Sequence, residues 1–189
     1  MANYSTPSSF LLKMAEHLTP EPTSPAQHSD DSKCIAAIVL PSGSGKSYFR
    51  AHYPGVEIKE ADEVCMPRAT EALSEFRSYA KESGDWTLFD IEMAKILKSR
   101  LHDGDVIMVA SVDLARAMDA NILGVFALTP SRWRENILAR RQDPLNYIEG
   151  YYDVYTHPSV VIFPGMGSLC DAISRNAETW TINYRRSQQ

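Results

Sequence analysis

The chain has few cysteines, no long apolar run and no excess of positive charge. Its three cysteines, Cys34, Cys65 and Cys170, are far apart and odd in number. We therefore expect neither a disulfide framework nor a thiolate metal site, which fits a reducing compartment. The longest apolar run is too short for a membrane-spanning helix. The first residues also lack the basic and apolar regions of a secretory signal.

The charge balance narrows the function classes. With 19 basic and 24 acidic residues, the net charge is −5. No global positive field is present to attract nucleic acid, which disfavours a protein that coats it, although a local basic groove stays possible. Together with the cysteine pattern, this predicts a cytoplasmic protein with no membrane partner.

The 189 residues suit one globular domain and are few for two. Residues 1–32 are rich in Ser, Thr and Pro and poor in bulky side chains, a composition that rarely packs. We expect a flexible arm over 1–32 and a folded domain over 33–189. The segment Phe10–Leu18 could form a short amphipathic helix in the arm, and we expect it to dock on the domain or on a protein partner.

From Lys33 onward, apolar runs alternate with amphipathic segments. Strands are expected at 35–40, 56–58, 106–112, 122–128 and 159–163, and helices at 47–53, 68–82, 90–101, 131–141 and 169–176. Strands separated by helices predict an α/β fold with a five-stranded parallel sheet and right-handed crossovers. In such sheets, ligands bind at the carboxyl ends of the strands.

The first strand runs directly into the motif Pro41–Ser47, PSGSGKS. Gly43 and Gly45 allow backbone angles closed to other residues, so that consecutive N–H groups can form an anion-binding nest at a helix N-terminus. Lys46 supplies a charge for the β- and γ-phosphates, and Ser47 a hydroxyl for Mg²⁺. The nucleotide-binding residues predicted in this motif are Ser42, Gly43, Ser44, Gly45, Lys46 and Ser47.

Leu40 stands where the usual phosphate loop, Gly-x-x-x-x-Gly-Lys-Ser, begins with glycine. That glycine mainly lets the chain leave the strand tightly, and Pro41 can set the turn by another route because its ring fixes φ. Leu40 therefore affects the expected shape of the loop more than its ability to hold an anion.

The order of segments from the phosphate loop onward resembles the small P-loop kinases. The loop is followed by a short helix, Pro54-Gly55, a short strand and then Ala61-Asp62-Glu63. The resemblance covers about residues 35–175 and is closest to the branch of polynucleotide 5′-hydroxyl kinases and related nucleoside, nucleotide and small-molecule kinases. It implies a three-layer P-loop NTPase fold with a five-stranded parallel sheet flanked by helices and a short lid. It also implies ATP and Mg²⁺.

The resemblance gives roles to two aspartates. Asp62, sixteen residues beyond Lys46, occupies the place of the family's general base, which accepts the proton of the attacking hydroxyl. It could instead cap the following helix, and Glu60 and Glu63 are nearby substitutes. Asp113 ends the third apolar run, where a carboxylate can hold Mg²⁺ through water. Asp113 could instead contact the acceptor or cap the next helix, and Ser111 could take the metal role in its place.

Four arginines lie between Thr129 and Arg141. In the resembling kinases, a lid helix after the fourth strand carries arginines that close over the nucleotide and stabilise the transferring phosphoryl group. Arg134 and Arg141 are seven residues apart and share a predicted helix face, and Trp133 and Ile137 share another. By this resemblance, Arg134 and Arg141 are catalytic candidates and Arg140 is a nucleotide-binding candidate. A solvated arginine-rich face is the plainer alternative.

The acceptor site is less well defined. The insertion between Asp62 and Asp105 should form it, and the aromatic side chains there could stack on a base or belong to the core. The arginines of this insertion could meet an acceptor phosphate or be solvated. The residues concerned are Arg68, Arg77, Tyr79, Lys81, Trp86 and Asp90.

Two further segments each have two interpretations. The run YIEGYYDVY, 147–155, could form a second aromatic wall or a surface turn. Gly165 and Gly167, after the fifth strand, could let the backbone approach an adenine ring or belong to an ordinary turn capped by Ser168.

These features predict an ATP-dependent phosphotransferase that acts on a hydroxyl, or a phosphate, of a nucleoside, nucleotide or nucleic-acid 5′ end, and less readily on another small molecule. The alternatives are a nucleotide-binding or NTPase module that serves an assembly, and a kinase-like chain without turnover. No guanine-recognition signature of the Asn-Lys-x-Asp type is present, which disfavours a switch GTPase.

Overall fold

The computed structural model describes residues 33–66 and 70–189. The arm predicted over residues 1–32 and the acceptor candidate Arg68 lie outside the described residues. Within the described part, five strands form one sheet in the order β2-β3-β1-β4-β5, and every neighbouring pair is parallel. The strands are β1 Ala36–Val39, β2 Lys59–Glu60, β3 Val106–Val109, β4 Asn121–Leu128 and β5 Val160–Phe163.

Strand β1 lies at the centre of the sheet because its four residues carry only apolar side chains. All four are fully buried, as are Ile35 before them and Leu40 after them. In register, Ala37 faces Ile107 of β3 and Ile122 of β4. A strand buried on both faces is typical of parallel sheets covered by helices.

Helices flank this sheet, as predicted. They are α2 Lys46–His52, α3 Ala61–Cys65, α4 Thr70–Ser83, α5 Thr87–Arg100, α6 Val112–Ala117, α7 Pro130–Ala139, α8 Ile148–Tyr155 and α9 Met166–Ser187, with a 3₁₀ turn η1 at Pro144–Tyr147. The predicted α/β fold with a five-stranded parallel sheet and flanking helices is confirmed. None of the described helices is long and apolar enough to cross a membrane.

Three elements differ from the sequence expectation. The second strand lies at Lys59–Glu60 rather than 56–58, because the pairing with Ile107 and Met108 of β3 begins only there. The run 147–155, for which a surface turn was one interpretation, is the last residue of turn η1 followed by helix α8. Helix α9 continues to Ser187 instead of ending near 176, and Trp180 on its extension donates a hydrogen bond to the Gly104 carbonyl at 3.3 Å.

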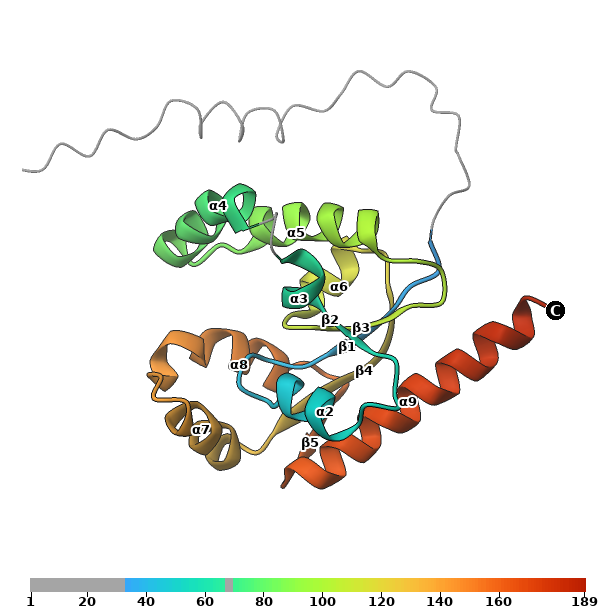
Figure 1. Cartoon of the computed structure of the whole chain (residues 1–189). Helices are drawn as coiled ribbons and strands as arrows, with labels where there is room; N and C mark the ends of the chain where they lie inside the picture. Colours follow the sequence, from blue (N-terminus) through green and yellow to red (C-terminus); the bar gives the residue numbers. More distant parts are fainter. Residues whose placement is uncertain (1–32, 67–69) are drawn as a thin grey trace, which may run out of the picture. The chain divides into compact units, whose positions relative to one another are not determined.

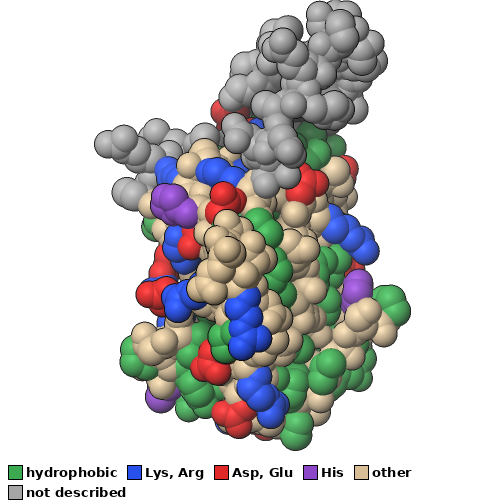
Figure 2. All heavy atoms as spheres, turned by 90° about the vertical axis from the view of Figure 1, so that its right-hand side faces the viewer, with side chains coloured by type: hydrophobic (Ala, Val, Ile, Leu, Met, Phe, Trp, Pro, Cys, Tyr) green, Lys and Arg blue, Asp and Glu red, His purple; other side chains and the backbone are tan. Residues whose placement is uncertain are grey.

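The strand directions decide where a ligand site can form. In Figure 1 the chain enters β1 from the right, so the carboxyl ends of the strands point left, toward α7 and α8. The long helix α9 runs from the lower centre to the C-terminus at the right. Figure 2 shows the right-hand face, where basic and acidic side chains are interspersed and no patch of one sign dominates. The phosphate loop leaves β1 at the other end of the sheet.

Candidate active site

The phosphate loop begins one residue later than the strand assignment suggests. The Leu40 N–H donates to the Val109 carbonyl at 2.9 Å, so Leu40 extends the β1–β3 ladder, and its side chain is fully buried. A turn follows, in which the Ser44 N–H donates to the Pro41 carbonyl at 3.1 Å. Leu40 is thus a core residue at the strand exit, and the turn that a first glycine usually allows is made by the next residues.

Both predicted loop glycines have a positive φ. Gly43 has φ 84° and Gly45 has φ 93°, and Gly45 directly precedes α2. Residues with a side chain rarely adopt a backbone conformation with positive φ, so the loop shape requires glycine at both positions. The first N–H groups of α2 have no partner within the helix and carry the positive end of its dipole. These features fit an anion such as a phosphate group.

A cavity of about 220 Å³ opens in front of this loop. Its lining includes four residues of the phosphate loop, the last residue of β2, one residue of α3, and residues from the end of α7 to η1. They are Ser42, Gly43, Lys46, Ser47, Glu60, Asp62, Ile137, Arg140, Gln142 and Tyr147. The fold therefore brings Lys46, Ser47, Asp62 and Arg140 together from separate parts of the sequence.

Lys46 is buried, with 8% of its surface exposed, and its Nζ donates to the Leu40 carbonyl at 3.3 Å. Burial lowers the pKa of its ammonium group, while the carboxylates of Glu60 and Asp62 oppose that change. The loop thus holds a poorly solvated positive charge beside two carboxylates, and an anion that enters the cavity would meet this charge without much intervening water.

The two carboxylates differ in environment. Glu60 is buried, which raises the pKa of its carboxyl, and Lys46 partly opposes the rise. Asp62 is exposed, lies in the first turn of α3, and lines the cavity. The residue before α3 is Glu60, and no side-chain hydrogen bond caps this helix. Asp62 is therefore placed as a cavity residue rather than as a helix cap, and Glu60 is its buried neighbour.

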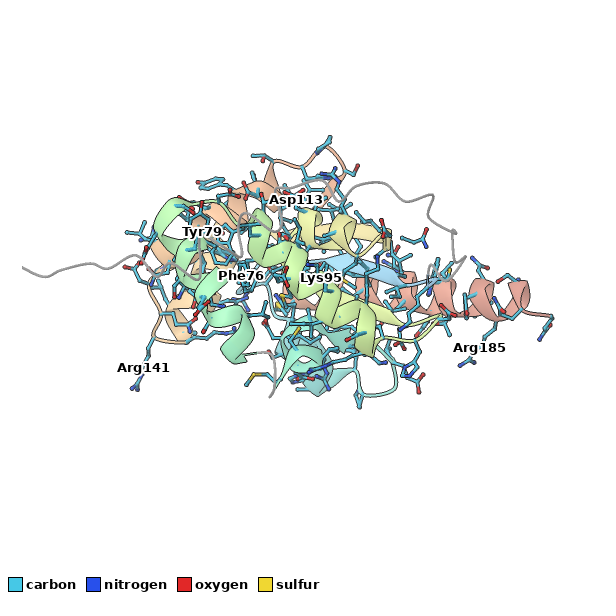
Figure 3. The ribbon with its side chains drawn as sticks, turned by 90° about the horizontal axis from the view of Figure 1, so that it is seen from above. Phe76, Tyr79, Lys95, Asp113, Arg141 and Arg185 are labelled. Atoms are coloured by element: carbon cyan, nitrogen blue, oxygen red, sulfur yellow. The ribbon has the colours of Figure 1, made fainter. Side chains whose placement is uncertain are left out.

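Asp113 lies away from this cavity. Its side chain is 79% exposed at the first turn of α6 and pairs with Arg116 at 3.2 Å. Figure 3 labels Asp113 on α6. The cap of α6 is Ser111, whose Oγ accepts from the Leu114 N–H at 3.1 Å. Neither the metal role nor the capping role predicted for Asp113 is supported by this placement, since its carboxylate faces solvent.

Asp90, one of the acceptor candidates, has an unusual environment for a carboxylate. It is buried on α5 and accepts a hydrogen bond from the Ser111 hydroxyl at 3.0 Å. Burial raises the pKa of Asp90 to about 6, against the opposing effect of the Ser111 bond. The sequence does carry a sign of this burial, since Asp90 lies between Phe89 and Met93 on the apolar face of a helix. Carboxylates are rarely buried unless they have a partner.

The arginines of α7 separate into different environments. Helix α7 ends at Ala139, so Arg141 lies beyond it with φ 55° and does not share a helix face with Arg134. That predicted pairing was wrong, because it assumed that the helix continued to residue 141. Arg141 points away from the molecule (Figure 3), and Arg134 is exposed. Arg140 lines the cavity.

Trp133 and Ile137 share the buried face of α7, as predicted. The Trp133 ring stacks on Tyr151 with a centroid distance of 4.3 Å. Tyr151 is buried in the core, whereas Tyr147 lines the cavity. The YIEGYYDVY segment therefore supplies one cavity residue, Tyr147, and two core residues, Tyr151 and Val154.

The two predicted acceptor aromatics lie at different helices: Tyr79 is on α4, and Trp86 immediately precedes α5. Trp86 meets Phe89 edge to face at 5.4 Å, and the Arg77 guanidinium lies 5.3 Å from the Phe89 ring centroid. Trp86 is 39% exposed, and none of these three residues lines the 220 Å³ cavity. Gly165 is the N-cap of α9, and no side-chain hydrogen bond caps this helix. The cap expected from Ser168 was wrong, because Ser168 lies inside the first turn and its hydroxyl donates to the Gly165 carbonyl. Gly165 and Gly167 have open space where a Cβ would stand, and the approach of an adenine ring to them stays a prediction.

No protein-family model matches the chain, and no curated protein matches it. Among solved structures, it is similar to a gluconokinase from Sinorhizobium meliloti 1021. The identity is 15%, the TM-score is 0.47, and the match covers 84% of this chain and 98% of that chain. A likeness of this size does not extend to activity or substrate.

The residues of the cavity fit a magnesium nucleotide. Glycines with positive φ, the amides of α2 and the Lys46 ammonium suit the phosphates. Mg²⁺ prefers oxygen ligands and usually keeps several waters while it bridges phosphates. The Ser47 hydroxyl and the Asp62 carboxylate lie in the same cavity. Among the described residues, no cluster of three or more His, Cys, Asp or Glu forms a metal cage of its own.

Proposed function

We propose that this chain is an ATP-dependent phosphotransferase that moves the γ-phosphate to a hydroxyl acceptor. The observation that carries the proposal is that Lys46, Asp62 and Arg140 line the same cavity of about 220 Å³. A nucleotide-binding module needs only the phosphate loop. A carboxylate and a guanidinium at the same cavity are the additional groups that phosphoryl transfer uses.

Each side chain has a defined task in this scheme. Lys46 pairs with the β- and γ-phosphates, and Ser47 provides an oxygen ligand to Mg²⁺. When bound, Mg²⁺ neutralises phosphate charge. Asp62 accepts the acceptor hydroxyl proton as the acceptor oxygen bonds to the γ-phosphorus and the bond to the β–γ bridging oxygen breaks. Arg140 stabilises the charge on the transferring group.

The proposed acceptor is a nucleoside, a nucleotide or a nucleic-acid 5′ end, with a phosphate acceptor or another small molecule as further possibilities. Tyr147 lines the cavity and offers an aromatic face for a base, whereas Trp86 lies outside the lining. The supporting contacts for a phosphate-bearing acceptor are fewer, since Arg77 lies over the Phe89 ring.

The test is transfer of label from γ-labelled ATP with Mg²⁺ to a panel of nucleosides, nucleoside monophosphates and 5′-hydroxyl oligonucleotides. We expect label to appear on at least one class of acceptor. Release of free phosphate with no labelled acceptor would contradict the kinase and favour the NTPase module. ATP binding without either product would favour a chain without turnover.

A further inference from the structure

Two side chains of helix α7 that do not line the cavity bind the phosphate loop. The Trp133 indole Nε1–H donates to the Ser42 carbonyl at 2.8 Å, and the Asn136 amide Nδ2–H donates to the Gly43 carbonyl at 3.3 Å. Two consecutive loop carbonyls are therefore held by side chains one helical turn apart on the same helix. These bonds link residues more than ninety positions apart in the sequence.

The loop is also pressed closely by its neighbours. A Cβ added at Gly43 would lie 2.2 Å from Ile137 Cδ1, and a Cβ added at Gly45 would lie 2.1 Å from Met166 Cε. The Asn136 amide also lies 3.8 Å from the Met166 sulfur. Both loop glycines are thus covered by side chains, one from α7 and one from the start of α9, and the loop has little space in which to move.

Trp133 is itself held in place. Its ring is 3% exposed and stacks on Tyr151, and the Tyr151 hydroxyl donates to the Leu128 carbonyl at 2.8 Å. Leu128 ends β4, the strand next to β1. The indole N–H that binds the loop is therefore connected to the sheet through a chain of buried contacts.

The geometry of the peptide bond gives these contacts a consequence for ligand binding. In a planar trans peptide, the carbonyl of one residue and the N–H of the next point in opposite directions. When Trp133 holds the Ser42 carbonyl outward, the Gly43 N–H must point to the other side of the loop. Within the described part of the chain, the Gly43 N–H has no hydrogen-bond acceptor.

We propose that Trp133 and Asn136 are positioning residues for the phosphate loop, which fix the two peptide planes on either side of Gly43. Trp133 orients the first plane so that the Gly43 amide is available to a phosphate. Asn136 holds the second plane, whose Ser44 N–H is bonded to the Pro41 carbonyl, and so keeps Gly43 in this conformation. The proposal rests on the proposed nucleotide site. The loop lacks the usual first glycine, and Leu40 at that position is fully buried in the core. In this proposal, the side chains of α7 therefore set the orientation of the loop. This gives α7 a role in nucleotide affinity that is separate from the role of its arginines.

The experiment uses the full chain and three variants. Trp133→Phe removes the indole donor and keeps a ring against Tyr151, Asn136→Ala removes the second donor, and Leu138→Ala is the matched control. Leu138 lies on the same helix and is 54% exposed. The dissociation constants of ATP and of inorganic triphosphate are measured by calorimetry, together with KM and kcat for the transfer reaction and the melting temperature without ligand.

We expect Trp133→Phe and Asn136→Ala each to weaken ATP and inorganic triphosphate about 3- to 10-fold, the effect of one lost hydrogen bond. KM for ATP should rise by a similar factor, kcat should change less, and Leu138→Ala should match the wild type. The equal loss for triphosphate matters because this probe has no base or ribose. It places the effect at the phosphates.

Unchanged affinity in both donor variants overturns the proposal, even if their melting temperatures fall, because that pattern means a purely structural role. A loss confined to kcat overturns it as well. If Trp133→Phe does not fold, the half-buried Asn136 decides alone. Failure of the proposed function looks different: the wild type then binds ATP but labels no acceptor, and the affinity comparison between variants still stands.

Discussion

The Ser111 hydroxyl donates a 3.0 Å hydrogen bond to the buried carboxyl group of Asp90, and so joins the chain after β3 to helix α5. Burial raises the pKa of Asp90 to about 6. Asp113 nearby adds to this rise, and the Ser111 bond opposes it. The pair thus lies between an apolar helix face and the carboxyl end of a central strand.

This pKa predicts how stability depends on pH. The folded state holds a proton that the unfolded chain releases near its ordinary value of 3.8, so the free energy of unfolding should fall as pH rises from about 4 to about 6. The full change is at most about 3 kcal/mol. Asp90→Asn should remove this pH dependence in urea unfolding curves, whereas exposed Asp113→Asn should keep it. The assignment would be contradicted if the free energy of unfolding changed with pH in the same way in the wild type and in Asp90→Asn.

Lys46→Ala should weaken ATP binding by at least about 10-fold and lower transfer further, because a charge-assisted contact to phosphate is lost. Isothermal titration with ATP and Mg²⁺ measures the first effect. Lys59→Ala is the control, since Lys59 pairs with Asp105 at 2.5 Å and lies outside the cavity. Equal losses in the two variants would point to a general charge effect instead.

Asp62→Asn should leave ATP affinity within about threefold and reduce transfer about 100- to 10,000-fold, the usual range for a lost general base. The matched control is Glu63→Gln, one residue further on, because Glu63 pairs with Arg50 and does not line the cavity. Transfer by Asp62→Asn at the wild-type rate would exclude Asp62 as the base. Glu60→Gln would then be the next variant to assay.

Arg140→Ala should reduce transfer about 10- to 100-fold, since the loss of one guanidinium removes a charge that stabilises the transferring group. Arg134→Ala and Arg141→Ala should stay within about twofold of the wild type, because exposed charges outside the site contribute little. Initial rates at saturating ATP compare the three variants. A larger effect at Arg134 or Arg141 than at Arg140 would assign the stabilisation of the transferring group to that arginine instead.

Leu40→Gly restores the usual loop sequence, yet it should destabilise the protein by about 3–5 kcal/mol because it removes a fully buried side chain and adds backbone freedom. ATP affinity of the folded protein should not improve. Thermal unfolding and ATP titration test the two statements, with Leu40→Ala as the milder variant. Tighter ATP binding by Leu40→Gly would mean that Leu40 impairs the loop.

The glycines at 43 and 45, the apolar run before them and the lysine and serine after them determined the phosphate loop from sequence alone. Local chemistry is enough there, since a positive φ requires glycine and a strand buried on both faces requires apolar residues throughout. The parallel sheet was also predictable from the sequence, because strands separated by helices need crossover connections that make neighbouring strands parallel. The same order of segments also placed Asp62 after β2, where it meets the loop.

Only the tertiary structure decided which other side chains reach the cavity. Helix α7 ends at Ala139, so Arg140 faces the cavity and Arg141 does not. Asp90 is buried by the packing of α5, while Asp113 faces solvent. The contacts of Trp133 with Ser42 join distant segments. Such placements depend on where a helix stops and what packs against it, and those energies arise from residues far apart in the sequence.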